Sequence, residues 1–189
     1  MKRVLGIYRD STQQLMLRHL TENNPIIGAI FLLGVSTGLR ISDLLNLRAD
    51  IRQNFTVTEG KTGKSRLINL SDDVWKILQN YVKNKNLQSS DRLFKISRQT
   101  VHKHISRLGT SIGLSRLGTH SMRVTYAYNV YRLSRCLNFT REAMNHKYIS
   151  TTILYLIGGF EWLLDEFTPN FEGILPNIDI FSKNKEVEQ

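Results

Sequence analysis

The sequence of 189 residues has one cysteine, three prolines and no long apolar run. A single thiol, that of Cys136, can neither close an intrachain disulfide nor supply a cysteine-rich zinc site, which favours a reducing compartment. The best apolar stretch, Pro25 to Val35, falls short of the ~18 residues that a membrane span requires. These absences exclude disulfide-rich secreted domains and integral membrane proteins, and they predict a cytoplasmic protein.

The sequence also lacks a glycine-rich phosphate loop of either standard spacing. Its carboxylates are scattered, and no pair or triad has the pattern of a two-metal phosphoryl-transfer site. Nucleotide-binding folds built on such loops are therefore excluded, and a magnesium-dependent nuclease is disfavoured. We expect neither a metal ion nor a cofactor.

Positive charge is in excess, with 26 Lys and Arg against 16 Asp and Glu and a formal net charge of +10. Such a balance favours a polyanionic partner, with nucleic acid ahead of an anionic membrane surface. The hydrophobic fraction of 41% is enough to fill the core of one domain. The composition therefore predicts a folded domain that binds nucleic acid.

The hydrophobic periodicity predicts mostly helices. Between Ile51 and Leu70 the period becomes alternating, which predicts a β-hairpin with a basic tip at Gly60 to Gly63. The helices are expected from Ser11 or Thr12 to before Asn23, from Pro25 to Gly38, after a Ser42 cap, from Ser71 through Ile77 to Tyr81, over Thr100–Ile112, from Gly118 or Thr119 to about Leu133, over Thr140–Asn145, from a Ser150 cap to Gly158, and over Glu161–Phe167. The fold class is mainly α with a small antiparallel β-sheet (α+β), which excludes parallel βαβ folds and β-sandwiches.

Four short clusters concentrate reactive side chains. They are Thr37-Gly-Leu-Arg40-Ile-Ser-Asp43, the hairpin tip with Lys61 and Lys64, His120-Ser-Met-Arg123, and the segment from Asn145-His146 to Tyr155. Each cluster alone has an ordinary structural explanation, because basic turns are usually solvated and a tyrosine at helical spacing usually belongs to the core. Only their combination points to chemistry.

In this order the clusters resemble the catalytic domain of the tyrosine recombinases, the family of phage integrases and Xer-type recombinases. The family pattern is an Arg in a TGLR box, a Lys at a hairpin turn, a His-x-x-Arg box, a His or Trp, and a Tyr nine residues later. This sequence fills those places with Arg40, Lys61, His120, Arg123, His146 and Tyr155. The resemblance covers about Ile26 to Tyr155 and implies the fold of that catalytic domain.

Three positions depart from the family pattern. Met122 replaces the usual Leu, Val124 stands where many relatives have a second His, and Asn145 stands where many have Gly. The choice of lysine is also open, because Lys61 directly follows Gly60 whereas Lys64 lies on the same turn.

The resemblance implies an enzyme that breaks and rejoins DNA strands through a 3′-phosphotyrosyl intermediate, without metal or ATP. Tyr155 is the expected nucleophile, and the planar forks of Arg40 and Arg123 suit the non-bridging phosphate oxygens. Lys61 is the expected general acid for the 5′-oxygen, and His120 the expected proton acceptor. His146 is expected to donate a hydrogen bond to a phosphate oxygen, and Asp43 to orient another group.

A second basic feature lies on the helix predicted after residue 97. Its side chains Arg98, His102, Lys103 and Arg107 recur at spacings of about three to five and are expected, with Lys64, to contact double-stranded DNA. A solvated basic face is the alternative explanation.

The expected domain organisation is one catalytic domain over residues 1–180, without the family's N-terminal core-binding domain, and a polar tail over residues 181–189. Either a compact recombinase or a catalytic fragment fits this length. The apolar segment with Trp162 and Phe167 is expected to pack on its own core or on a neighbouring protomer, as in a homotetramer on DNA. The location implied is the cytoplasm of a bacterium, with a bacterial or phage gene and association with the nucleoid.

Two rival functions remain at this point. A type IB topoisomerase shares the Arg-Lys-Arg-His-Tyr chemistry but relaxes DNA as a monomer. A non-catalytic DNA-binding remnant is the second rival, which the six filled positions disfavour.

Overall fold

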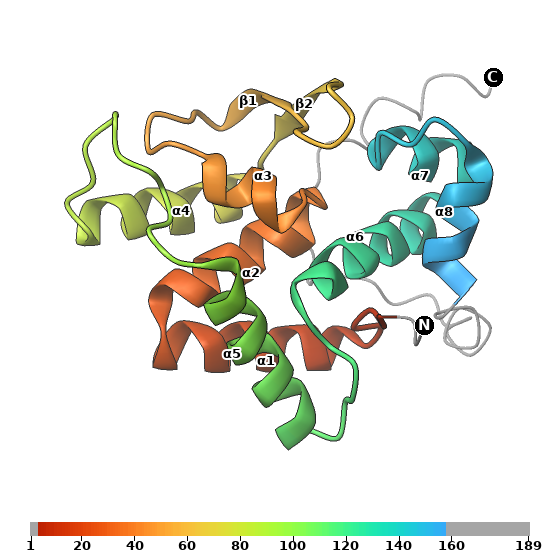
Figure 1. Cartoon of the computed structure of the whole chain (residues 1–189), viewed down its shortest axis with the longest axis horizontal. Helices are drawn as coiled ribbons and strands as arrows, with labels where there is room; N and C mark the ends of the chain where they lie inside the picture. The colour runs from red at the N-terminus through yellow and green to blue at the C-terminus, as the bar shows by residue number, and fades with distance from the viewer. Residues whose placement is uncertain (1–3, 158–189) are drawn as a thin grey trace.

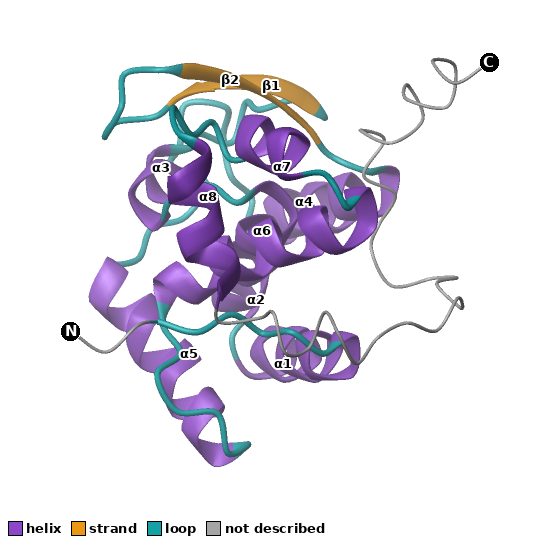
Figure 2. Ribbon diagram, turned by 90° about the vertical axis from the view of Figure 1, so that its right-hand side faces the viewer, coloured by secondary structure: helices purple, strands orange, loops and turns teal. Residues whose placement is uncertain are grey.

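A computed structural model of the chain describes residues 4–157, which form eight helices and one two-stranded antiparallel sheet (Figures 1 and 2). The elements are α1 (Asp10–Asn23), α2 (Pro25–Thr37), α3 (Ile41–Asn46), β1 (Asn54–Thr58), β2 (Ser65–Asn69), α4 (Asp72–Asn84), α5 (Arg98–Ser111), α6 (Thr119–Ser134), α7 (Leu137–Ala143) and α8 (Ile149–Leu156). This confirms the predicted class. No helix among these residues is both long and apolar enough to span a bilayer.

Helices α2 and α6 form the centre of the molecule. Because α2 is apolar nearly all round, it is buried along its length and packs against α1, α4 and α6. Helix α6 is also buried on almost every side, with α7 and α8 packed on it (Figure 2). Side chains that α6 contributes to a site are therefore held by a rigid support.

The ends of several helices follow the local sequence. Gly38 ends α2 in the left-handed conformation, with φ of 63°, and its N–H donates to Gly34 O. The side chain of Ser71 caps α4 by accepting a hydrogen bond from the Val74 N–H. Both ends agree with the sequence prediction.

Other details differ from the prediction. Helix α3 starts at Ile41 with Arg40 as its cap residue, and α8 starts at Ile149, so neither Ser42 nor Ser150 is a cap. Helix α7 begins at Leu137. Its cap residue is Cys136, whose sulfur accepts a hydrogen bond from the Phe139 N–H. Helical spacing groups Ile77 with Val74, Leu78 and Tyr81 on one face, but Ile77 is 46% exposed whereas the other three are buried. The predicted helix over Glu161–Phe167 and the polar tail lie outside the described residues.

The hairpin lies at the top of the molecule in Figures 1 and 2, beside α7. Its register places Phe55 opposite Ile68 and Val57 opposite Arg66. The inward face carries the buried Val57 and Ile68, and because side chains alternate along a strand, Glu59 continues this face toward the tip. The hairpin thus turns its tip, with both candidate lysines, toward the helices.

Substitutions at two glycines, Gly38 before α3 and Gly63 at the hairpin tip, separate the cost of backbone strain from the cost of close packing. A methyl group on Gly38 would lie 2.3 Å from Tyr126 Cδ1, whereas one on Gly63, which has a similar φ of 66°, would meet nothing within 4 Å. We expect Gly63→Ala to cost about 1–2 kcal/mol from backbone strain alone, and Gly38→Ala to cost about 3 kcal/mol or more because the clash adds to the strain. Urea denaturation of both variants measures the difference, and equal losses would contradict the packing described.

Candidate active site

One cavity of about 710 Å³ gathers all six residues that the sequence singled out as catalytic. Its lining includes Arg40, Lys61, His120, Arg123, His146 and Tyr155, together with Lys64 and Arg98. These side chains come from the start of α3, the hairpin tip, the first turns of α6, the segment after α7, and α8. Segments that are more than a hundred residues apart in the sequence therefore meet in one place.

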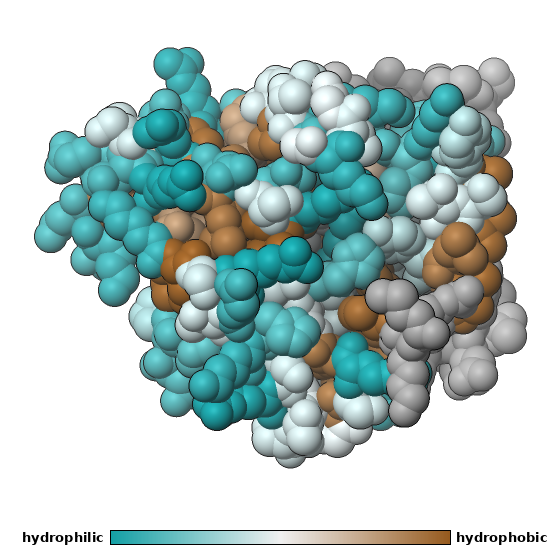
Figure 3. All heavy atoms as spheres, viewed as in Figure 1, coloured by the Kyte–Doolittle hydropathy of each residue, from teal (hydrophilic) through white to brown (hydrophobic). Residues whose placement is uncertain are grey.

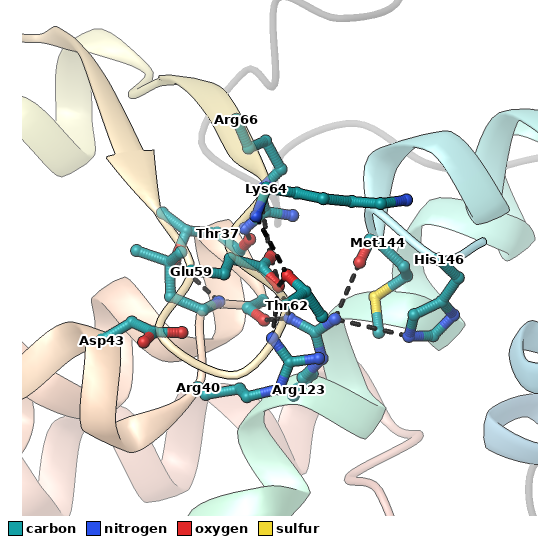
Figure 4. Close-up of polar contacts among 12 residues, drawn as sticks. Thr37, Arg40, Asp43, Glu59, Thr62, Lys64, Arg66, Arg123, Met144 and His146 are labelled. Atoms are coloured by element: carbon teal, nitrogen blue, oxygen red, sulfur yellow. Dashed lines mark hydrogen bonds and ion pairs between the residues drawn. The ribbon is translucent and has the colours of Figure 1, made fainter.

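Arg123 lies at the floor of this cavity and is only 1% exposed (Figure 4). Its Nη1 donates to Gly38 O at 2.6 Å, and its Nη2 donates to Met144 O at 2.7 Å. Burial, followed by the nearby charge of Arg40, lowers its pKa. One guanidinium thus joins the turn that carries Arg40 to the segment that carries His146.

His146 is buried beside Arg123, and its hydrogen bonds determine its tautomer. Arg123 Nη2 lies 3.3 Å from Nε2, and because a guanidinium only donates, Nε2 accepts. The proton of the neutral ring then lies on Nδ1, which is 3.0 Å from Thr152 Oγ1. Burial, followed by the charges of Arg123 and Arg40, lowers the pKa of His146 to about 4. Both ring nitrogens are engaged, so a hydrogen bond to phosphate requires His146 to change partner.

Tyr155 lies between two imidazole rings. Its ring centroid is 5.2 Å from that of His120 and 5.1 Å from that of His146. His120 is exposed at the cavity, yet desolvation on the side that faces the protein, followed by the charges of Arg123 and Arg40, lowers its pKa. A neutral imidazole that can accept a proton therefore stands beside a phenol at neutral pH.

The two lysines of the hairpin tip are both exposed and both line the cavity. The tip is tied to α3 by Asp43, a buried residue whose Oδ1 accepts a hydrogen bond from the Gly60 N–H at 3.1 Å. Asp43 therefore orients the residue directly before Lys61.

Comparison with known proteins shows the family of this chain. The model of the phage integrase family matches residues 7–157. The chain belongs to the phage integrase family. A probable integrase/recombinase of Bacillus subtilis, YoeC, is 29% identical over 149 residues, covering 74% of this chain and 81% of YoeC. The tyrosine recombinase XerA of Saccharolobus solfataricus is 31% identical over 127 residues, covering 64% of this chain but only 42% of XerA. The chain thus spans under half of that relative.

Solved structures of integrases share the fold. A crystal structure of XerA recombinase matches with a TM-score of 0.68 and 20% identity, covering 90% of this chain and 68% of that one. A lambda integrase dimer bound to a core site matches with a TM-score of 0.63 and 20% identity, covering 93% of this chain and 65% of that one. The expected family and the expected catalytic-domain fold are confirmed.

The three departures from the integrase pattern are explained by the packing. Asn145 adopts the left-handed conformation, with φ of 55°, which glycine adopts readily and asparagine tolerates better than most residues. Met122 is buried in the core, directly against Gly34. Val124 packs with Tyr8 and Tyr128 rather than in the site cavity. Met122 and Val124 thus lie outside the cavity lining, whereas Asn145 is part of it.

Sequence reasoning missed Glu59, the charged residue at the centre of the site's arginines. Its side chain is fully buried and forms an ion pair with Arg40, while its Oε1 lies 3.8 Å from Arg123 Nη1 and 4.0 Å from Arg66 Nε (Figure 4). The alternation of Phe55 and Val57 already indicated an inward position for Glu59.

Residues Arg98, His102, Lys103 and Arg107 are all exposed on α5, whereas its Val101, Ile105 and Leu108 are buried. Arg98 also lines the cavity, so this basic face begins at the site and leads away from it. Hydrophilic side chains cover much of the view in Figure 3, and a brown patch at its right edge lies over α8. That helix exposes Ile149, Leu154 and Ile157.

Stability should depend on pH through His146. Because its pKa is lower in the folded protein than in the unfolded chain, the unfolded chain binds the proton first, and stability falls as the pH drops from about 6.5 toward about 4. Between pH 7 and pH 5 the wild type should lose about 2 kcal/mol more than His146→Gln. Urea denaturation at both pH values measures this, with His19→Gln on the exposed face of α1 as a control that keeps the wild-type loss. An equal loss in His146→Gln would contradict the buried neutral ring.

Proposed function

We propose that this integrase-family protein is a site-specific DNA recombinase that cleaves and rejoins strands through a 3′-phosphotyrosyl intermediate in the cytoplasm, at the nucleoid. The observation that carries the proposal is the convergence, in one cavity, of Arg40, Arg123, two histidines, the two lysines of the hairpin tip and Tyr155. A DNA-binding remnant would have no need for a phenol between two neutral imidazoles.

The side chains suit one displacement at phosphorus. The Tyr155 oxygen attacks the phosphorus, its proton passes to His120, and the bond from phosphorus to the 5′-oxygen breaks. Lys61 gives a proton to the departing 5′-oxygen, so that a 5′-hydroxyl and a 3′-phosphotyrosine result. A 5′-hydroxyl from the partner strand reverses the same steps.

The arginines suit the charge that grows during this reaction. Arg40 and Arg123 each bear N–H donors at the cavity, and a pentacoordinate phosphorus places additional negative charge on its non-bridging oxygens. The phosphodiester energy is kept in the protein–DNA bond, so this scheme uses neither ATP nor a metal ion. His146 accepts a hydrogen bond from Arg123 and can bind a phosphate oxygen once that hydrogen bond is broken.

Lys61 is favoured over Lys64 as the acid by the electrostatics of the site. Its charge is among those that lower the pKa of His120, whereas that of Lys64 is not, and this supports Lys61 as the acid. Lys64 then serves as a DNA contact at the rim of the cavity.

Double-stranded DNA is the proposed partner. The whole chain carries a net charge of +10. Exposed basic residues lie on α5 and at the hairpin tip, and three of them, Lys61, Lys64 and Arg98, line the cavity. Structural neighbours include XerH bound to its difH substrate and the Tn1549 integrase with transposon DNA. Binding here should be salt-dependent, because phosphate contacts release counterions.

Assembly into a homotetramer on DNA is also proposed. The exposed apolar side chains of α8 lie beside Tyr155 in the sequence, and Leu154 is 53% exposed. Burying this patch against another protomer removes it from water.

Covalent trapping tests the enzyme directly. The substrates are a set of nicked suicide duplexes that together cover the DNA flanking the gene in overlapping segments. The wild type should form a protein–DNA adduct, and Tyr155→Phe should reduce it at least 10³-fold because the nucleophilic oxygen is gone. Tyr148→Phe removes the other tyrosine that lines the cavity and should leave the adduct intact. No adduct with wild type, or an undiminished adduct with Tyr155→Phe, would overturn the proposal.

A modified leaving group separates the two lysines. Lys61→Ala should slow cleavage about 10²–10⁴-fold on ordinary DNA, because the 5′-alkoxide leaves poorly without a proton. On a duplex with a bridging 5′-sulfur, whose thiolate leaves without an acid, the rate should return to near that of wild type. Lys64→Ala is the matched control and should lower DNA affinity without this rescue. Rescue of Lys64→Ala instead would assign the acid to Lys64.

A further inference from the structure

Three guanidinium groups surround one carboxylate beneath the cavity. Glu59 is fully buried, pairs with Arg40 through Oε2, and has Arg123 and Arg66 at 3.8 and 4.0 Å from Oε1. Figure 4 shows Glu59 between Arg66 above and the two site arginines below. Without a carboxylate here, three like charges would face each other in a poorly solvated space.

Two of the three arginines have other supports. Arg123 donates to Gly38 O and Met144 O, and Arg66 donates to Ala143 O and Thr37 O. These backbone acceptors hold both guanidiniums in place whatever the charge of Glu59.

Arg40 differs from the other two. It precedes α3 in an extended conformation, and its side chain hydrogen-bonds to the Glu59 carboxylate. That side chain is 19% exposed and lines the cavity. A guanidinium has five N–H donors, so the hydrogen bond from Arg40 Nη1 to Glu59 leaves other donors available to a phosphate in the cavity.

Glu59 also builds the turn that bears the lysines, mainly through its backbone. Its carboxylate adds one long contact, a hydrogen bond that Oε2 accepts from Thr62 Oγ1 at 3.4 Å, and the amide oxygen of a glutamine can accept the same bond. The backbone carbonyl of Glu59 accepts hydrogen bonds from the N–H groups of Thr62 and Gly63, at 3.2 and 2.8 Å, and its N–H donates to Lys64 O at 3.0 Å. A change confined to the carboxylate leaves these bonds in place, so the two contributions of Glu59 can be separated by experiment.

We propose that the Glu59 carboxylate is a positioning residue for the cleavage reaction, acting by holding Arg40 in the orientation that receives the scissile phosphate. The proposal rests on the proposed function. The Glu59 carboxylate of the hairpin then links the TGLR box, through Arg40, to the His-x-x-Arg box, through Arg123.

Glu59→Gln is the decisive variant, because it keeps the side-chain size and the backbone bonds but removes the charge. On the suicide duplex that traps wild type, its adduct rate at saturating DNA should fall at least 10-fold, while DNA affinity stays equal or increases because a negative charge is lost. Glu142→Gln, an exposed site on α7, removes the same charge and should keep the wild-type rate. A wild-type rate in Glu59→Gln would overturn the proposal, whereas the absence of any wild-type adduct would instead overturn the proposed function.

A double-mutant cycle tests whether Glu59 acts through Arg40. In an Arg40→Ala background, adding Glu59→Gln should slow the reaction no further, because the group being positioned is already gone. Additive losses would overturn the route through Arg40. The 5′-sulfur duplex gives a second discrimination: the Glu59→Gln defect should persist on it, and rescue would mean that Glu59 acts on Lys61.

The DNA-free protein offers a readout that does not depend on activity. The Nη–H protons of Arg40, which bond to Glu59 through Nη1, should exchange slowly with solvent in wild type and at least 10-fold faster in Glu59→Gln, as followed by NMR at low temperature. The Nη–H protons of Arg123 are the internal reference and should be unchanged, because backbone carbonyls hold that guanidinium. Equal behaviour of Arg40 in both proteins, or equal acceleration of both arginines through general loosening, would overturn the proposal.

Discussion

The buried guanidinium of Arg123 is the constraint on which the site depends. It is 1% exposed, and its hydrogen bonds to Gly38 O and Met144 O join two segments that are otherwise far apart in the chain. A buried charge is tolerated only when its donors are satisfied, so these carbonyls must lie where they do. Arg40 follows the first carbonyl by two residues, and His146 follows the second by two.

Helix α6 makes this arrangement possible. A helix buried on nearly all sides cannot rotate or shift without disturbing its neighbours, and its first turns carry both His120 and Arg123. The exposed part of the site, the hairpin tip with its lysines, is tied to α3 through Asp43 and faces Arg123 of α6 through Glu59. Helix α6 thus holds His120 and Arg123 on a rigid support, whereas Lys61, the proposed proton donor, lies on a turn.

Much of the fold and the lining of the cavity could be predicted from the sequence. The apolar composition of α2, the alternation around Val57 and the left-handed Gly38 are local signals, and the structure follows them. The six reactive positions could be grouped only by their resemblance to a family, because nothing local says that residues 40 and 155 are neighbours. Their roles in the reaction remain predictions.

What the sequence could not show depends on tertiary contacts. The role of Glu59 requires knowing that the hairpin folds back over Arg40, and the tautomer of His146 requires the positions of Arg123 and Thr152. The start of α7 was misplaced because a cysteine sulfur, a weak acceptor, serves as its cap. The outward position of Ile77 follows from which neighbours α4 has, which periodicity alone does not specify.

The site is assembled from segments that are more than a hundred residues apart in the chain, and this has a consequence for protein synthesis. A nascent polypeptide that has emerged only as far as the hairpin holds Arg40 and Lys61 but neither Arg123, its supporting carbonyl at Met144, nor Tyr155. Domains generally fold as units during translation. On the proposed mechanism, in which Tyr155 is the nucleophile, a ribosome-bound chain is therefore unable to cut DNA until residues up to at least 155 have been made.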